Sequence, residues 1–251
     1  MWLSLLLKGF EGFGQYLLLL RRSFSGLLRF HLYWELWTHE SIQIGRDSLF
    51  LVSIISLFVG AVTTVQTAYQ IVSPFIPKST IGAIVSTSAI LELAPTITSL
   101  VLAGRIGSSI ASQIGSMRVS EQIDALEVMG INSATYLILP RLFGALIFFP
   151  VLVIYACFII HIGGIVAGAL SGAVNPTQFG IGARSFYEDF QIVFMLIKAV
   201  TFGFIISTVS AYQGYYVRGG ALEVGYASTR AVVISCLMIL VSDYVLAQLL
   251  L

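Results

Sequence analysis

Long apolar tracts are the feature of this sequence that most restricts its fold. Four of them reach the roughly 20 apolar residues that a membrane-spanning helix needs. They run from Leu49 to Val72, Leu137 to Leu170, Ile192 to Tyr212 and Ala231 to Leu251. A fifth tract, Ile81 to Ala103, is weaker because it contains Glu92, Pro95 and many hydroxyl side chains. The pattern predicts an all-α membrane protein with five transmembrane helices.

Composition points the same way. Of the 251 residues, 57% are hydrophobic and 10% are charged, whereas soluble domains usually have about a quarter of their residues charged. A formal net charge of +1 favours neither nucleic acid nor acidic substrates as a partner. Cys157 and Cys236 lie inside apolar runs, so we expect packing residues rather than a disulfide or metal pair.

The distribution of basic residues predicts the orientation, because Arg and Lys accumulate on the cytoplasmic side of membrane proteins. With a cytoplasmic N-terminus and five spans, the inner segments hold Lys8, Arg21, Arg22, Arg29, Arg46, Arg105, Arg118, Arg141, Arg218 and Arg230. The outer loops hold only Lys78 and Arg184, and Lys198 falls within a span. We therefore expect a multi-pass membrane protein with a cytoplasmic N-terminus and its C-terminus on the outer side, and the start of the sequence predicts no cleavable signal peptide.

The first 37 residues predict a helix that lies along the membrane surface. Its polar residues share one narrow face, and they are Ser4, Lys8, Glu11, Gln15, Arg22 and Arg29. A sixth span is the alternative, but the charges make it costly. Gly9, Gly12 and Gly14 predict a break in this helix. His31 to Asp47 predicts an interfacial elbow, so residues 1–47 precede a single transmembrane domain of residues 48–251.

Small residues recur every four positions in two stretches. The first is Gly107, Ala111 and Gly115, and the second is Gly164, Gly168 and Gly172. Small side chains let helices approach closely in lipid. We expect most of this packing to lie within one subunit.

The most polar stretch lies between the second and third spans. Its apolar residues recur at intervals of four, three and three, and they are Val119, Ile123, Leu126 and Met129. The spacing predicts a short amphipathic cytoplasmic helix of about three turns, from Arg118 to an end at Gly130. Such a helix either docks into a groove on a partner or lies on the lipid headgroups, and the pattern alone favours neither.

The run ELAPTITSLVLAGRIGSSIASQIGSMRVSEQIDALEVMGI, from Glu92 to Ile131, resembles the MlaE-type permease family. This family includes the YrbE permeases of actinobacteria and the plastid lipid permeases. The shared signature is Glu-Leu-small-Pro, then Ala-Gly-Arg-x-Gly, then Gly-x-Met-(Arg/Lys)-x-x-Glu-Gln, Ala-Leu and Met-Gly. It continues through Pro140 and Arg141. The chain departs from the family at Leu91, where many members have a basic residue.

The resemblance implies a homodimeric permease subunit of an ABC transporter that moves phospholipids or related lipids between the inner membrane and the outer envelope. It implies two partners, a cytoplasmic ATPase dimer and an MCE-domain lipid-binding protein. The sequence has no G-x-x-x-x-G-K-[ST] phosphate loop, so we expect ATP on the partner and no cofactor, metal or catalytic site in this chain. The resemblance also implies an ATPase-coupling helix, formed by Arg118, Glu121, Gln122, Asp124, Leu126, Glu127 and Met129.

Glu92 is the main candidate for substrate binding, because a carboxylate inside a span is costly and usually functional. Pro95 predicts that the helix bends or opens beside it. We expect a lipid cavity lined by Glu92, Leu93, Gln66 and Tyr69. The alternative is that Glu92 only partners a buried hydroxyl or amide.

Three other polar residues fall within spans. We expect Lys198 to snorkel outward or to pair with Glu188 or Asp189. Asp243 is expected to pair with a neighbouring helix, and His161 to be a packing histidine with its polar atoms satisfied.

These polar residues also suit an ion-coupled secondary transporter or channel, but we find no internal repeat of the kind common in such proteins. An intramembrane enzyme is a third possibility. The sequence has neither a G-x-S-x-G nor an H-E-x-x-H motif.

Overall fold

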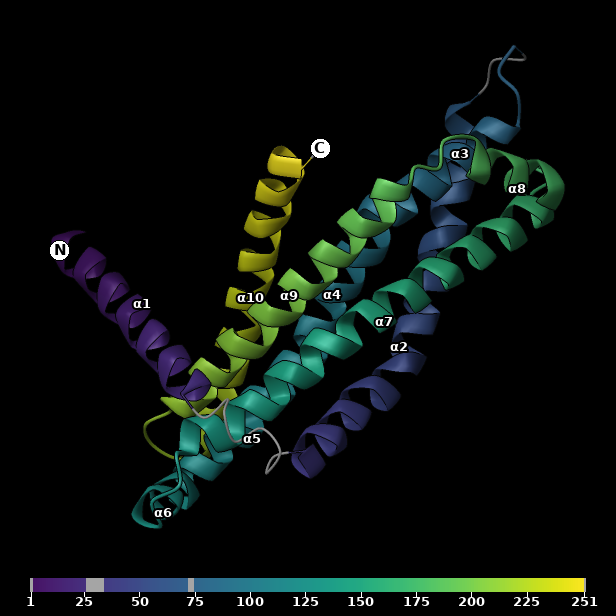
Figure 1. Ribbon diagram of the computed structural model, residues 1–251. Coiled ribbons are helices and arrows are strands. Elements are labelled where there is room, and N and C mark those ends of the chain that lie inside the picture. Colours follow the sequence, from purple (N-terminus) through teal and green to yellow (C-terminus); the bar gives the residue numbers. More distant parts are fainter. Residues whose placement is uncertain (1, 26–33, 72–74, 251) are drawn as a thin grey trace. The chain divides into compact units, whose positions relative to one another are not determined.

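The computed structural model describes residues 2–25, 34–71 and 75–250, and its regular structure within these ranges is helical (Figure 1). The α-helices are α1 (Trp2–Phe24), α2 (Trp34–Gln70), α3 (Ser79–Ser88), α4 (Thr98–Leu102), α5 (Ser108–Val119), α6 (Gln122–Val128), α7 (Ser133–Leu170), α8 (Pro176–Ser185), α9 (Asp189–Tyr215) and α10 (Ala221–Leu250). Two π-helical segments, η2 (Ala89–Ile97) and η3 (Ala103–Gly107), interrupt the run from α3 to α5.

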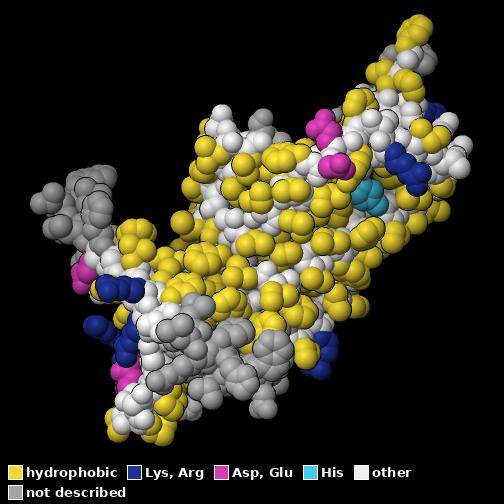
Figure 2. Space-filling view, in the orientation of Figure 1, with side chains coloured by type: hydrophobic (Ala, Val, Ile, Leu, Met, Phe, Trp, Pro, Cys, Tyr) yellow, Lys and Arg dark blue, Asp and Glu magenta, His cyan; other side chains and the backbone are white. Residues whose placement is uncertain are grey.

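Five helical stretches in the described chain are long and apolar enough to cross a membrane. They are Ile44–Gln70, Ser79–Val119, Ser133–Leu170, Asp189–Tyr215 and Ala221–Leu250. Hydrophobic side chains cover most of the described surface on the face shown in Figure 2, as expected for helices in contact with lipid. The prediction of five transmembrane helices is confirmed.

The second span departs from α-helical geometry at the place that Pro95 marks. A proline has no backbone N–H and clashes with the preceding turn, so a regular α-helix does not continue through it. Here the helix widens into the π-helical segment η2, which contains both Glu92 and Pro95. Such widened turns are frequent at functional sites.

The N-terminal helix is continuous, so the predicted break is wrong. α1 runs without interruption through Gly9, Gly12 and Gly14. Each glycine costs a helix about 1 kcal/mol relative to alanine, but tertiary contacts compensate. Leu19 and Ser23 are buried, and Tyr16 donates a hydrogen bond to Thr208 Oγ1 at 2.8 Å.

The described part of the predicted elbow is helical, and its position at the membrane interface stays a prediction. Residues 34–47 form the first turns of α2, which continues into the first span. Residues 31–33 of the elbow and Arg29 lie outside the described residues, and nothing is described of the side chains of Ser4 and Lys8.

The predicted helix from Arg118 to Gly130 is interrupted. α5 ends at Val119, and α6 begins at Gln122. Between them Glu121 has a φ of 59°, a left-handed conformation that breaks helical geometry. The predicted end is correct, because Gly130 has a φ of 75°. Its N–H donates to the Glu127 carbonyl oxygen, and the Ile131 N–H donates to that of Leu126, which is the Schellman motif.

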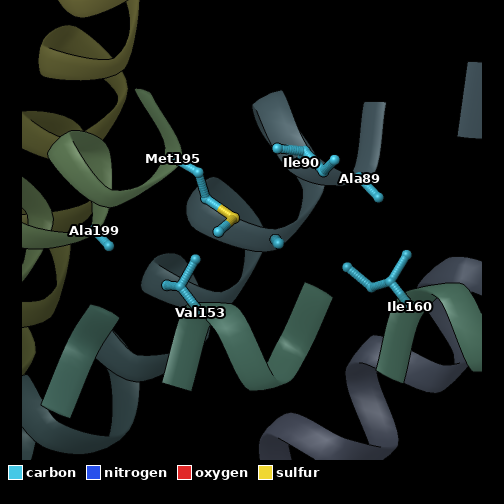
Figure 3. Close-up of a cluster of buried hydrophobic side chains, with 7 residues drawn as sticks. Ala89, Ile90, Val153, Ile160, Met195 and Ala199 are labelled. Atoms are coloured by element: carbon cyan, nitrogen blue, oxygen red, sulfur yellow. The ribbon is translucent and has the colours of Figure 1, made fainter. Parts of the chain in front are cut away.

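The chain forms two compact units. Unit 1 comprises Met1–Ile44, Ala103–Leu146 and Gly203–Met238, and unit 2 comprises Gly45–Leu102, Ile147–Phe202 and Ile239–Leu251. The separation of residues 1–47 from residues 48–251 stays a prediction. Unit 2 has a core of Ala89, Ile90, Ala94, Val153, Ile160, Met195 and Ala199. Figure 3 shows Met195 of α9 and Val153 of α7 pointing toward each other in this core.

Glycines bring α2 and α7 into close contact within unit 2. A Cβ atom at Gly60 would collide with the backbone of Ile160, and one at Gly163 would collide with that of Leu57. The spacing of small residues in the sequence did not predict this pair of glycines. Two of the expected small residues, Gly164 and Gly168, also pack closely, but Gly172 has no atom within 4 Å of a Cβ position.

We predict that Gly163→Val destabilises the protein, because α2 and α7 must separate to admit the side chain. The expected loss is about 1–3 kcal/mol, measured as a lower midpoint of thermal unfolding in detergent. Gly225→Ala in α10 is the control, because its Cβ would meet no atom within 4 Å. Equal midpoints for the two variants would contradict the close approach of α2 and α7.

Candidate functional site

A buried lysine lies at the centre of a charged cluster in unit 2. Lys198 of α9 has no exposed side-chain surface. Its Nζ atom lies 2.6 Å from Asp243 Oδ1 of α10 and 2.7 Å from Glu92 Oε1 of η2. The ammonium also donates a hydrogen bond to the Leu91 carbonyl oxygen at 3.0 Å. Three transmembrane segments therefore meet at one cation.

Thr96 joins the two carboxylates on their other side. Its hydroxyl lies 3.2 Å from Glu92 Oε2 and 3.2 Å from Asp243 Oδ2. A hydroxyl has one proton to donate, so Thr96 serves one carboxylate at a time. The cluster thus offers more acceptor oxygens than the ammonium and the hydroxyl satisfy.

Exposure differs among the three charged residues. The side chain of Asp243 is 15% exposed, whereas that of Glu92 is 47% exposed. Glu92 is therefore the open side of the cluster, and Lys198 and Asp243 form its closed side. A buried ammonium is costly unless it is paired and hydrogen-bonded, and here both conditions are met.

Local structure explains how these side chains meet. The wider η2 segment holds Glu92 and Thr96, four residues apart, on the side that faces Asp243. The ring of Phe194, one turn before Lys198 on α9, has its centroid 4.7 Å from Nζ, which adds a cation–π contact. The cation of the cluster comes from α9.

The partners of Lys198 differ from those predicted from the sequence. The expectation that Lys198 snorkels or pairs with Glu188 or Asp189 is wrong, because its partners are Glu92 and Asp243. Asp243 does pair with a neighbouring helix, as expected. The sequence did contain a signal for this cluster, because three separate spans each contain an ionisable residue.

The other predicted cavity residues do not join this cluster. Leu93 is partly buried against the core of unit 2. Gln66 is exposed and Tyr69 is 84% exposed on α2. Neither makes a hydrogen bond or ion pair with a residue that the structure describes. Their role in a lipid cavity stays a prediction.

His161 is satisfied in the way that the sequence analysis expected. Its Nδ1 lies 2.7 Å from the Cys157 carbonyl oxygen, and its Nε2 lies 2.9 Å from Ser86 Oγ. Because a carbonyl only accepts, Nδ1 carries the proton and Ser86 donates to Nε2.

Most of the predicted coupling residues are exposed, and the others are partly buried. Those exposed at α6 and its ends are Glu121, Gln122, Asp124, Glu127 and Met129. Arg118 pairs with Asp124 at 2.6 Å across the corner between α5 and α6. Leu126 is partly buried, and Ile123 is fully buried. Val128 was not among the predicted coupling residues, but it is 89% exposed beside the exposed Met129.

Glu127 forms a second polar network, within unit 1. Its Oε1 accepts hydrogen bonds from Ser133 Oγ at 2.7 Å and Tyr215 OH at 3.1 Å. The same oxygen lies 2.9 Å from Arg22 Nη2 at the end of α1. Asn132 Nδ2 also donates to the Arg22 carbonyl oxygen. Glu127 therefore connects α6 with α1, α7 and α9.

This network lowers the pKa of Glu127. The hydrogen bond from Ser133 lowers it most, burial opposes that effect, and the positive charge of Arg22 lowers it further. Both favourable partners stabilise the ionised carboxylate, so the network is strongest when Glu127 is charged.

The family that matches this chain and the relative described next are both permeases. The family described as "Permease MlaE" matches residues 37–249. A "Probable ABC transporter permease protein" of Rickettsia bellii is 36% identical over 95% of this chain and 92% of its own length.

Two relatives with more specific names are also similar. "Protein TRIGALACTOSYLDIACYLGLYCEROL 1, chloroplastic" of Arabidopsis thaliana is 35% identical over 88% of this chain and 63% of its own length. The "Intermembrane phospholipid transport system permease protein MlaE" of Haemophilus influenzae is 29% identical over 81% of this chain and 78% of its own length.

We predict that Lys198→Met destabilises the protein by about 3 kcal/mol, because it leaves two carboxylates in a span without their cation. The triple variant with Glu92→Gln and Asp243→Asn should recover most of this loss. Thermal unfolding in nanodiscs measures both effects. The buried ion cluster would be refuted if the single variant were as stable as the wild type.

We also predict that acid loosens the attachment of α1 to α6. Because the folded pKa of Glu127 is lowered, its stabilising effect is present above the ordinary pKa of about 4.3 and is lost as pH falls through the lower folded value. Spin labels at Leu18 and Ala125 should give a broader distance distribution in acid.

Glu127→Gln should give the broad distribution already at neutral pH. Asp124→Asn is the matched control, because Asp124 bonds to Arg118 rather than to α1. A narrow neutral-pH distribution in Glu127→Gln would contradict the role of the network.

Proposed function

The chain belongs to the MlaE permease family, and from this membership we propose that it moves phospholipids or related lipids between the inner membrane and the outer envelope. It is the permease subunit of an ABC transporter, an integral membrane protein and a transport subunit rather than an enzyme. The observation that carries the proposal is a charged cluster, half open at Glu92, inside three of the spans of such a protein.

The cluster suits a lipid headgroup because of its charge balance. One ammonium faces two carboxylates, so no positive charge remains free to bind a phosphate. The open group is the Glu92 carboxylate, which accepts hydrogen bonds. We infer that it receives a donor from the headgroup, such as an amine or a hydroxyl, while the acyl chains occupy apolar surface.

α6 is the proposed contact with a separate ATPase. Its exposed surface combines carboxylates at Glu121 and Asp124 with the apolar side chains of Val128 and Met129. A surface of this kind has both a charged and an apolar component for a docking groove. The Glu127 network then transmits a push on α6 to the ends of α1, α7 and α9.

The chain also has proposed partners and a proposed orientation in the membrane. We infer a homodimer, a cytoplasmic ATPase dimer that binds the ATP, and an MCE-domain protein that receives or delivers lipid outside. The N-terminus is then cytoplasmic and the C-terminus periplasmic. Of the five spans, that of α10 has the smallest buried share, 11%, which leaves it free to contact lipid or a second copy.

The alternative is an ion-coupled transporter or channel, and the charged cluster is the one observation that favours it. The energy source separates the two functions. The full chain, purified with its ATPase and reconstituted in vesicles, should transfer lipid only with ATP. Transfer that follows an ion gradient and ignores ATP would contradict the proposal.

We predict that the double variant Glu121→Ala/Asp124→Ala lowers ATP-driven lipid transfer by at least about fivefold, the lower range of coupling between sites. Glu188→Ala/Asp189→Ala is the matched control, because it removes two exposed carboxylates at the start of α9, one just before the helix and one in its first turn. Equal transfer by both double variants would exclude α6 as the coupling element.

A further inference from the structure

A groove in unit 2 is not used by the function proposed above. Its volume is about 650 Å³, within the range of sites for small ligands. α7 contributes Ile154 and Phe158, α9 contributes Ile192 and Met195, η2 contributes Ile90, and α8 contributes Arg184. Apart from Arg184, these lining side chains are apolar.

The floor of this groove is buried core, and its walls are exposed side chains. Ile90 and Met195 are buried members of the core in Figure 3. Phe158 is 66% exposed, and Ile154 and Ile192 are also exposed. A ligand in the groove would therefore lie on packed core and would be held from the sides by exposed apolar side chains.

The groove opens on an exposed apolar face of α7. Exposed apolar side chains recur along α7 at intervals of three or four residues, at Ile147, Val151, Ile154, Phe158, Ile162 and Val166. This spacing puts them on one face of the helix. The face belongs to a candidate span, so the groove is accessible from the hydrocarbon of the bilayer.

Arg184 is the one charged side chain in the lining. It lies in the last turn of α8, outside the candidate spans, and makes no hydrogen bond or ion pair with the described residues. His161, which also lines the groove, has both nitrogens occupied. The nearby carboxylate of Glu188 lines another cavity, with Thr80 and Gln191.

We propose that this groove binds one acyl chain of an anionic phospholipid from the surrounding bilayer, with the lipid phosphate on Arg184. The apolar walls suit an alkyl chain and offer nothing to a hydrated solute. A guanidinium outside the apolar span is placed at headgroup depth, where it pairs with phosphate in a forked geometry. This lipid site is separate from the Lys198 cluster and does not depend on transport.

The test uses the full chain in phosphatidylcholine nanodiscs that contain a trace of phosphatidylglycerol with a photoreactive group in its acyl chain. After illumination, mass spectrometry locates the adducts. We expect them on the segments that contain Ile154 to Phe158 and Ile192 to Met195, and we expect unlabelled phosphatidylglycerol to compete better than phosphatidylcholine.

Two variants probe the two ends of the site. Ile154→Trp fills the groove and should abolish these adducts, whereas Val166→Trp, on the same face of α7 but outside the lining, should leave them. Arg184→Gln should weaken competition by phosphatidylglycerol about fivefold, the effect of one basic residue at an anionic surface. Lys78→Gln, at the other basic residue of the outer loops, should not.

Several outcomes would overturn the proposal. Adducts spread evenly along α7 would mean ordinary bilayer contact. Adducts that persist in Ile154→Trp would exclude binding of the acyl chain in the groove. Competition by phosphatidylglycerol that is unchanged in Arg184→Gln would exclude binding of the phosphate at Arg184. If Ile154→Trp does not fold, Arg184→Gln still decides, because its side chain is exposed. If a helix of a partner protein occupies the groove and excludes lipid, the groove is a protein-binding site instead.

Discussion

The pairing of the Lys198 ammonium with Glu92 and Asp243 is the interaction on which the rest of unit 2 depends. A lysine with no exposed side-chain surface inside a span is tolerated only when its charge is matched. The match requires η2, α9 and α10 to stay together. It also leaves one carboxylate half open. The same contacts therefore hold the spans together and, in our proposal, form the polar part of a lipid-binding site.

Unit 1 uses a similar arrangement with the opposite charge at its centre. The carboxylate of Glu127 gathers donors from Arg22, Ser133 and Tyr215. These contacts attach α6 to its neighbours, and a contact of Glu127 with the ATPase stays a prediction. In our proposal the exposed residues of α6 contact the ATPase, and Glu127 transmits the movement of α6 to the ends of α1, α7 and α9.

Much of the fold follows from the sequence because span length and glycine chemistry are local properties. The five spans and the end of α6 at Gly130 were predictable for this reason. The partners of Lys198 were not, because Glu92 lies 106 residues away along the chain. The break before α6 was also missed, since a left-handed Glu121 has no signature in residue type. α1 stays unbroken because packing outweighs its glycines.

The most direct test of the central claim is to locate the headgroup of a bound phospholipid. A lipid with a photoreactive group in its headgroup, reconstituted with the chain and its ATPase, should form adducts on the segment from Leu91 to Thr96, and ATP turnover should reduce them. Adducts that are confined to the ends of the spans, with none on this segment in any state, would contradict a lipid site at the charged cluster.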